Sequence, residues 1–174
     1  MSPAKVTKRR KAPARKRRRR TVRGKIIVRM YDVGFGDAFL VFIPTSAGVK
    51  KVLIDCGSIK LTDQKPIKSI VKQIIHDVTD HGKARIDLVI GTHRHKDHVS
   101  GFSDDAWDDV EVGEVWMPWT EDPDDPEARR IRETQAGIAA HLQATFDRLG
   151  AAAPEEFSLI ALNALSNESA MTTL

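Results

Sequence analysis

Short apolar segments, separated by glycine, aspartate and proline, recur from residue 26 onward and limit what the chain can fold into. Runs of this length are typical of β-strands that are buried on at least one face of a sheet. They occupy residues 26–31, 38–43, 52–54, 86–90 and 115–117. Strands that come first and then alternate with helices indicate a layered α/β sandwich.

Two stretches change to an apolar period of three to four residues, which predicts amphipathic helices that pack on the sheet. The first has its apolar residues between positions 67 and 78. Pro66 suits the first turn of this helix, and we expect Gly82 to end it. The second is expected to begin at residues 124–127, where a capping aspartate precedes a proline, and to end at Gly150. Two weaker strand candidates are residues 157–162 and 171–174.

Charge is divided unequally along the 174 residues. Residues 1–25 hold 13 Lys or Arg and no acidic residue, whereas residues 26–174 hold 15 basic and 24 acidic residues, a net charge of −9. We expect a disordered basic arm at residues 1–24, because its charges repel and it has almost nothing apolar to bury. The folded domain is then expected at residues 25–174, a length that suits one core. This division excludes a basic nucleic-acid-binding domain that spans the whole chain.

The basic arm is expected to bind polyanions through residues 5–25, with Arg17, Arg18, Arg19 and Arg20 as its densest part. Neutralising phosphates releases counterions and produces a salt-sensitive affinity that does not depend on base sequence. Nucleic acid is therefore a candidate partner. An anionic membrane surface, nuclear import in a eukaryotic host, or a solvated tail with no partner are the alternatives.

Cysteine and hydropathy patterns bear on the compartment. The single cysteine, Cys56, cannot form an internal disulfide, so nothing requires an oxidising environment. No apolar run reaches the roughly 18 to 20 residues that span a bilayer, and no apolar stretch follows the N-terminal charges as a secretory signal would need. A cytoplasmic protein without membrane insertion is expected.

Three of the six histidines fall in one hexapeptide, His93-Arg94-His95-Lys96-Asp97-His98, directly after an expected strand. In an extended segment His93 and His95 point the same way and can bind one metal ion. Asp97 and His98, beyond a turn, can bind a second ion nearby. Imidazole with carboxylate suits zinc, with manganese or iron as alternatives, and two such ions can activate a water molecule. The other interpretation is a polar loop with solvent-exposed histidines.

Residues 92–98 (THRHKDH) resemble the HxHxDH signature of the metallo-β-lactamase superfamily. Two further segments resemble this family in order and spacing. Residues 31–38 (YDVGFGDA) resemble the DVGQGDA segment of the branch that includes the metallohydrolase domain of bacterial competence DNA-uptake channels. Residues 52–57 (VLIDCG) resemble its LIDxG strand end, so that the resemblance covers about residues 25–118.

The resemblance implies an αββα sandwich and a set of residue roles. His93, His95, Asp97 and His98 would be metal ligands. Asp55 would support them from behind by orienting an imidazole, with an ordinary turn aspartate as the alternative. Asp97 would in addition orient the nucleophilic water or accept its proton, although its role as a ligand is enough to explain it.

The chain also departs from the family's pattern. Phe35 stands where the branch has glutamine, and Cys56 where glycine is common. We expect a small buried thiol at Cys56, with approach to the metal as the alternative. The family's later ligands, an aspartate in a TGD context and a histidine in an HHGS context, have no counterpart, since the only histidine after His98 is His141 in the second expected helix.

Residues 166–171 resemble the segment that precedes the TGD strand, so we expect the N-terminal part of such a domain. An incomplete ligand set should bind metal weakly. A half-domain should also leave one sheet face and one edge uncovered, which favours self-association.

Two functions follow as expectations. The first is a metal-dependent hydrolase in which metal-activated water attacks a phosphodiester or acyl ester bond. The alternative is a non-catalytic truncated fragment that binds polyanions or a partner through the basic arm. Residues 104–127, with 11 acidic residues and no Lys or Arg, are interpreted as a solvated loop, with a contact to the arm as the alternative.

Overall fold

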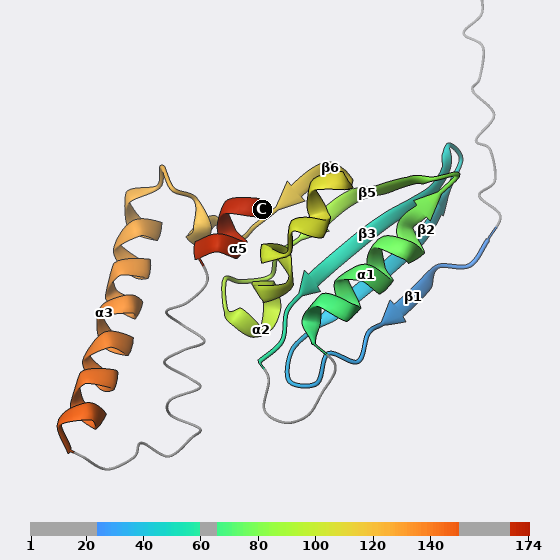
Figure 1. The fold of residues 1–174 in the computed structure, drawn as a ribbon. Helices are drawn as coiled ribbons and strands as arrows, with labels where there is room; N and C mark the ends of the chain where they lie inside the picture. Colours follow the sequence, from blue (N-terminus) through green and yellow to red (C-terminus); the bar gives the residue numbers. More distant parts are fainter. Residues whose placement is uncertain (1–23, 60–65, 150–167) are drawn as a thin grey trace, which may run out of the picture.

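The computed structural model describes residues 24–59, 66–149 and 168–174, which form an α/β fold on a six-stranded mixed sheet (Figure 1). Strands β1, β2 and β3 form an antiparallel meander, and β3, β5 and β6 run parallel to one another. The two-residue strand β4 pairs with the start of β5. The strands are β1 Ile27–Met30, β2 Ala38–Thr45, β3 Gly48–Cys56, β4 Thr79–Asp80, β5 Lys83–Ile90 and β6 Glu111–Trp116.

Helices lie between and after the strands. The α-helices are α1 Ile67–Val78, α2 Lys96–Val99, α3 Pro126–Leu149 and α5 Glu168–Thr173. The 3-10 helices are η1 Ser100–Ser103, η2 Asp105–Asp109 and η3 Trp119–Glu121. Among the described residues, none of the helices combines the length and the hydropathy that a membrane crossing requires.

The structure confirms the α/β class and the strands expected from the apolar runs, and it corrects one boundary and one type of element. Helix α1 ends at Val78, not at Gly82. His81 and Gly82, with φ of 50° and 80°, instead form the tight turn between β4 and β5, where a two-residue hairpin requires positive φ. Residues 171–174, expected to begin a strand, are the end of α5 and the residue that follows it.

Several expectations concern residues outside the described ranges. They are the arm up to residue 23 with Arg17–Arg20, the strand candidate at 157–162, and Gly150. Within the described residues there is one sheet, so the second sheet of an αββα sandwich stays a prediction.

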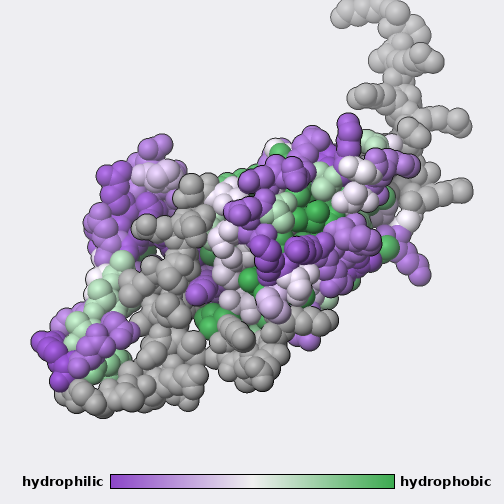
Figure 2. Space-filling view, viewed as in Figure 1, coloured by the Kyte–Doolittle hydropathy of each residue, from purple (hydrophilic) through white to green (hydrophobic). Residues whose placement is uncertain are grey.

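The core lies between the sheet and α1. The helix buries Ile70, Val71, Ile74 and Val78. Their spacing of one to four residues follows the apolar pattern from which the helix was predicted. Leu40 of β2, Leu53 of β3 and Ile86 of β5 are fully buried beneath it. The side that carries α1 is mostly hydrophilic on its outer surface, with smaller hydrophobic areas between (Figure 2).

The opposite side of the sheet, which we call the open face, is also apolar. Residues paired across strands lie on the same side of a sheet. Two rows therefore cross the open face from β1 to β6: Val28, Val41, Val52, Leu88 and Glu114, and Met30, Phe39, Ile54, Ile90 and Trp116.

None of these open-face residues belongs to the buried core cluster. At the sheet's margins Val28, Met30 and Trp116 are 62%, 72% and 56% exposed. All four residues of β1 are exposed, contrary to the expectation that this strand would be buried on one face. The described residues thus cover one face of the sheet and leave the other accessible to solvent.

Helix α3 stands apart from the sheet (Figure 1). It begins as expected, because the Asp125 carboxylate accepts hydrogen bonds from the backbone amides of Glu127 and Ala128 at 2.8 and 2.9 Å. Its apolar stripe does not pack on the core, however. Ile138 and Leu142 are 57% and 44% exposed, which corrects the expectation of a second core-packing helix.

Candidate metal centre

The candidate site forms where three chain segments meet at the carboxyl ends of β3 and β5. The backbone amide of Asp37 donates to the carbonyl of Asp97 at 3.1 Å, and the amide of Gly57 donates to the carbonyl of Asp37 at 3.0 Å. Asp37 thus joins the β3 end to the histidine segment. The three segments that resemble the metallo-β-lactamase pattern are in direct contact, although they are distant in the chain.

Two glycines permit this close approach. A Cβ atom at Gly57 would lie 2.4 Å from the backbone nitrogen of His98, and one at Gly36 would lie 2.3 Å from the carbonyl oxygen of Gly57. Gly36 also has a φ of +151°, which side-chain-bearing residues rarely adopt. A larger residue at Gly57 would push the β3 end away from the histidine segment, and one at Gly36 would push residues 31–38 away from both.

Asp55 connects the end of β3 to the start of the histidine segment. Its φ of 54° is uncommon for a residue other than glycine, although aspartate tolerates it better than most. The residue is 3% exposed. Its Oδ1 accepts the backbone amide of Thr92 at 2.8 Å, and its Oδ2 accepts the Thr92 hydroxyl at 2.7 Å. These bonds fix the carboxylate beneath the histidines.

The same carboxylate orients His98. Oδ2 of Asp55 lies 2.9 Å from Nδ1 of His98. Because an ionised carboxylate can only accept, this contact favours a hydrogen on Nδ1, and in the neutral ring Nε2 then carries the lone pair that can bind a metal ion. Nε2 lies 3.5 Å from Oδ2 of Asp97, on the inner side of the cluster.

His93, Asp97 and His98 form a group whose potential ligand atoms all lie within 4.8 Å of one another. The rings of His93 and His98 are close, with centroids 3.8 Å apart. The side chains of Asp97 and His98 are 14% and 15% exposed, so the group is accessible without being fully solvated. Two imidazoles and one carboxylate are a donor set that zinc accepts.

His95 is placed differently from the expectation. The chain bends at Arg94, and His95 lies at the N-cap of α2, exposed and outside the group of three. Its ring remains near that of His93, with centroids 4.8 Å apart in an edge-on arrangement. The structure therefore groups His93 with Asp97 and His98, instead of pairing it with His95.

The surroundings favour a neutral imidazole at His93. Burial, together with the nearby His98 and His95, lowers the pKa of His93 below its ordinary value. A neutral ring is the form that binds a metal ion. The Oγ1 atom of Thr92 lies 3.0 Å from Nδ1 of His93.

Cys56 is a buried thiol, as expected. Burial, followed by the charges of Asp55 and Asp104, raises the pKa of Cys56 to about 12. A Cβ atom at Gly101 would lie 2.6 Å from its sulfur, so the thiol packs directly against η1. Within the described residues Cys56 is not part of the metal-ligand group.

Asp37 is a further candidate, to which sequence reasoning assigned no separate role. Its Oδ2 lies 3.6 Å from Nδ1 of His98, and its side chain is 41% exposed. Asp37 belongs to residues 31–38, which resemble the DVGQGDA segment. Its proximity to His98 depends on backbone hydrogen bonds between distant segments, which the sequence spacing of the motifs does not reveal. His141, by contrast, is an exposed residue of α3, as its position in the predicted helix indicated.

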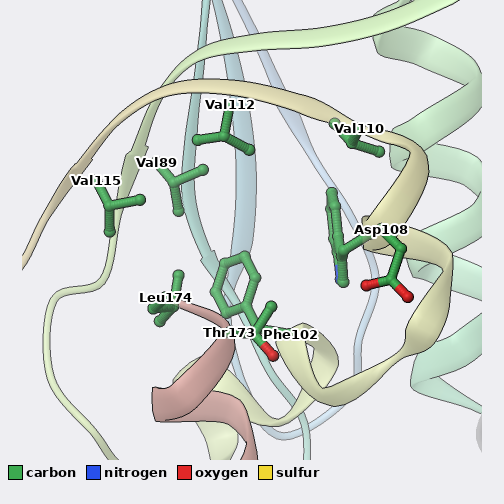
Figure 3. Close-up of a pocket in the computed structure, with 9 residues that line it drawn as sticks. Val89, Phe102, Asp108, Val110, Val112, Val115, Thr173 and Leu174 are labelled. Atoms are coloured by element: carbon green, nitrogen blue, oxygen red, sulfur yellow. The ribbon is translucent and has the colours of Figure 1, made fainter.

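A separate cleft of about 220 Å³ lies between β5, β6 and the end of the chain (Figure 3). Val89, Val112, Val115 and Phe102 line it. Asp108 is the one charged residue in its lining, and none of the metal-centre residues contributes to it. This cleft is therefore a packing feature distinct from the candidate metal centre.

Comparisons with protein-family models, with curated proteins and with solved structures found no match to this chain. A functional assignment therefore depends on the residues described above and on their geometry.

Proposed function

We propose that this chain carries the metal-binding part of a metal-dependent hydrolase, in which metal-activated water attacks a phosphodiester or acyl ester bond. The observation that supports it best is the group formed by His93, Asp97 and His98, with ligand atoms within 4.8 Å of one another. Three protein ligands with one open position are typical of catalytic zinc sites. Manganese and iron are the alternative metals.

The wider proposal is that these residues belong to a metallo-β-lactamase-like αββα sandwich. Contact between residues 31–38, 52–57 and 92–98 supports it, because these three segments carry the resemblance. The open face supports it as well, since a sandwich would cover such a face with a second sheet.

The residues of the site have distinct roles in this proposal. His93, Asp97 and His98 would hold the metal, and Asp55 would accept the Nδ1 hydrogen of His98, which leaves Nε2 on the side of Asp97. Asp97 also orients the attacking water or accepts its proton. When bound, zinc supplies Lewis acidity and lowers the pKa of a coordinated water to about 7. A second ion would require His95 and ligands beyond those that the described residues bring together.

Within this proposal a phosphodiester, such as a nucleic acid, is the favoured substrate. The basic arm would concentrate a polyanion around the protein, because 13 basic residues precede residue 26 with no acidic one among them. The same charges support the second candidate function, non-catalytic binding of polyanions through the arm.

Zinc binding by the purified full chain tests the proposal. We expect about one zinc ion per chain after dialysis, lost in His98→Ala and retained in His141→Ala, whose histidine is exposed on α3. Hydrolysis of bis(p-nitrophenyl) phosphate should follow the zinc content. Zinc binding without hydrolysis would favour the second candidate function, and an absence of zinc from the unaltered protein would contradict the proposed metal centre.

A further inference from the structure

The hydroxyl group of Thr92 lies between the buried Asp55 carboxylate and the first histidine of the candidate metal centre. Thr92 comes shortly after the end of β5. Its Oγ1 donates to Oδ2 of Asp55 at 2.7 Å, and the same Oγ1 lies 3.0 Å from Nδ1 of His93. Asp55 is 3% exposed, whereas Thr92 is an exposed residue. Hydrogen bonds, and not burial, therefore hold this hydroxyl in place.

The direction of the two hydrogen bonds follows from the hydrogens that are available. A threonine hydroxyl has one hydrogen, and an ionised carboxylate can only accept. The hydroxyl hydrogen of Thr92 therefore goes to Asp55, and Oγ1 has only lone pairs to offer His93. A hydrogen on Nδ1 of His93 completes the second contact. In the neutral ring, Nε2 of His93 then carries the lone pair.

Both histidine rings depend on the same oxygen atom of Asp55. Its Oδ2 accepts the Thr92 hydroxyl and also lies 2.9 Å from Nδ1 of His98. The direct contact favours the Nδ1–H form of His98, and the contact through Thr92 favours the same form of His93. The centroids of the two rings are 3.8 Å apart. One buried carboxylate thus favours the same tautomer in two adjacent imidazoles.

We propose that Thr92 is a positioning residue that extends the effect of Asp55 to His93. Its hydroxyl stabilises the Nδ1–H tautomer of His93 and leaves Nε2 of this ring to bind a metal ion. The group formed by His93, Asp97 and His98 then offers an Nε2 atom from each histidine. This inference rests on the proposed metal centre, and it assigns a role to a residue that is not one of the three ligands.

The backbone of Thr92 is held by the same carboxylate, which limits what a substitution changes. Oδ1 of Asp55 accepts the backbone amide of Thr92 at 2.8 Å, and any residue other than proline retains this amide. Serine keeps the hydroxyl without the methyl group, whereas valine keeps the branched shape without the hydroxyl. Because Thr92 is exposed, neither substitution leaves a cavity in the core. The pair Thr92→Ser and Thr92→Val therefore isolates the hydroxyl.

The tautomer of His93 in the zinc-free protein is the direct test. Long-range proton–nitrogen correlation spectra of the isotope-labelled full chain, recorded with a chelator at about pH 8, show which nitrogen of each neutral ring carries hydrogen. The signals missing from His93→Gln identify His93. We expect the Nδ1–H pattern in the unaltered protein and in Thr92→Ser, and a shift toward the Nε2–H pattern in Thr92→Val. A merely structural role of Thr92 would not produce this shift in a folded variant.

Zinc affinity measures the consequence for the metal centre. Competition with a chromogenic chelator should show binding weakened about tenfold or more in Thr92→Val, because the partners that orient ligating histidines contribute at this level. Thr92→Ser should bind zinc as the unaltered protein does. Thr134→Val is the matched control, since Thr134 is exposed on α3 and its hydroxyl donates to the carbonyl of Arg130 at 2.8 Å. This control should change neither the zinc affinity nor the tautomer of His93.

Three outcomes would overturn the role of Thr92. They are an Nε2–H pattern for His93 in the unaltered protein, a tautomer that Thr92→Val leaves unchanged, and losses in Thr92→Ser that equal those in Thr92→Val. Circular dichroism establishes that each variant retains its fold. If the unaltered protein bound no zinc, the proposed function would fail instead. The spectra of the zinc-free protein would still decide whether Thr92 sets the tautomer of His93.

Discussion

The two faces of the sheet are built from the same strands but have different environments. In β3, Leu53 is fully buried beneath α1, whereas its neighbours Val52 and Ile54 point to the open face and are only partly buried. The candidate metal centre depends on the covered side, since Asp55 is 3% exposed and follows Leu53 by two residues. The face that carries α1 thus contains the buried residues next to the candidate metal centre. The open face has apolar side chains that no described element covers.

The largest test of this contrast compares adjacent residues of β3. Leu53→Ala should lower the free energy of unfolding by about 2–5 kcal/mol, because it leaves a cavity in the core. Val52→Ala, on the open face, should cost about 1 kcal/mol or less, since its methyl groups already contact water. Urea denaturation monitored by circular dichroism, at a concentration where the chain is monomeric, measures both. Equal losses would mean that the open face is covered in the monomer.

The second test asks whether the buried carboxylate positions the metal ligand. Asp55→Asn replaces an acceptor of the His98 proton by an amide and should weaken zinc binding about 10- to 100-fold. Competition with a chromogenic chelator measures the affinity. Asp108→Asn, which alters an exposed carboxylate of η2 outside the candidate centre, is the control. Unchanged affinity in Asp55→Asn would show that the contact to His98 does not contribute to metal binding.

Much of the helical structure could be predicted from the sequence because its signals are local. The period of α1 and the aspartate cap of α3 depend on residues within a few positions of one another. Gly82 was misassigned because a glycine with positive φ serves a helix end and a hairpin turn equally well. The apolar stripe of α3 indicates that one side of this helix favours an apolar contact, but the sequence does not show which surface makes that contact.

The candidate site divides in the same way. His93, Asp97 and His98 were identified because they lie within six residues. The position of His95 depends on a single bend at Arg94, which spacing alone does not reveal. The approach of Asp37 depends on backbone contacts between segments about 60 residues apart in sequence, so no local pattern reports it.

A smaller effect concerns the attachment of β1 to α1 and its dependence on pH. Asp77 of α1 forms an ion pair with Arg29 and accepts a hydrogen bond from Tyr31 at 2.8 Å. Partial burial acts to raise the pKa of Asp77, but the hydrogen bonds from Arg29 and Tyr31 outweigh it and hold this pKa below its ordinary value. A depressed carboxyl pKa stabilises the folded state above the unfolded pKa of about 3.9, and this contribution is lost as the pH falls.

Asp77→Asn should therefore lower the free energy of unfolding by about 1 kcal/mol at neutral pH. The difference from the unaltered protein should begin to shrink as the pH falls below about 4, where the carboxylate protonates in the unfolded chain, and should be lost as the pH passes through the lower pKa of the folded state. Urea denaturation at a series of pH values measures it. A difference that stays constant down to the acid limit would show that the ion pair does not hold β1 against the covered face.

The smallest expected effect concerns α3, and it tests whether this helix packs against either face of the sheet. Ile138 is 57% exposed on a helix that stands apart from the sheet, so Ile138→Lys should change the free energy of unfolding by no more than about 0.5 kcal/mol. Ala139, its neighbour, is 8% exposed, and Ala139→Lys should cost more because the lysine would have to displace packed atoms. Thermal and urea denaturation of the two variants provide the comparison. A large loss of unfolding free energy in Ile138→Lys would mean that the apolar stripe of α3 is covered in solution. Helix α3 would then contribute to a buried core, as the sequence predicted.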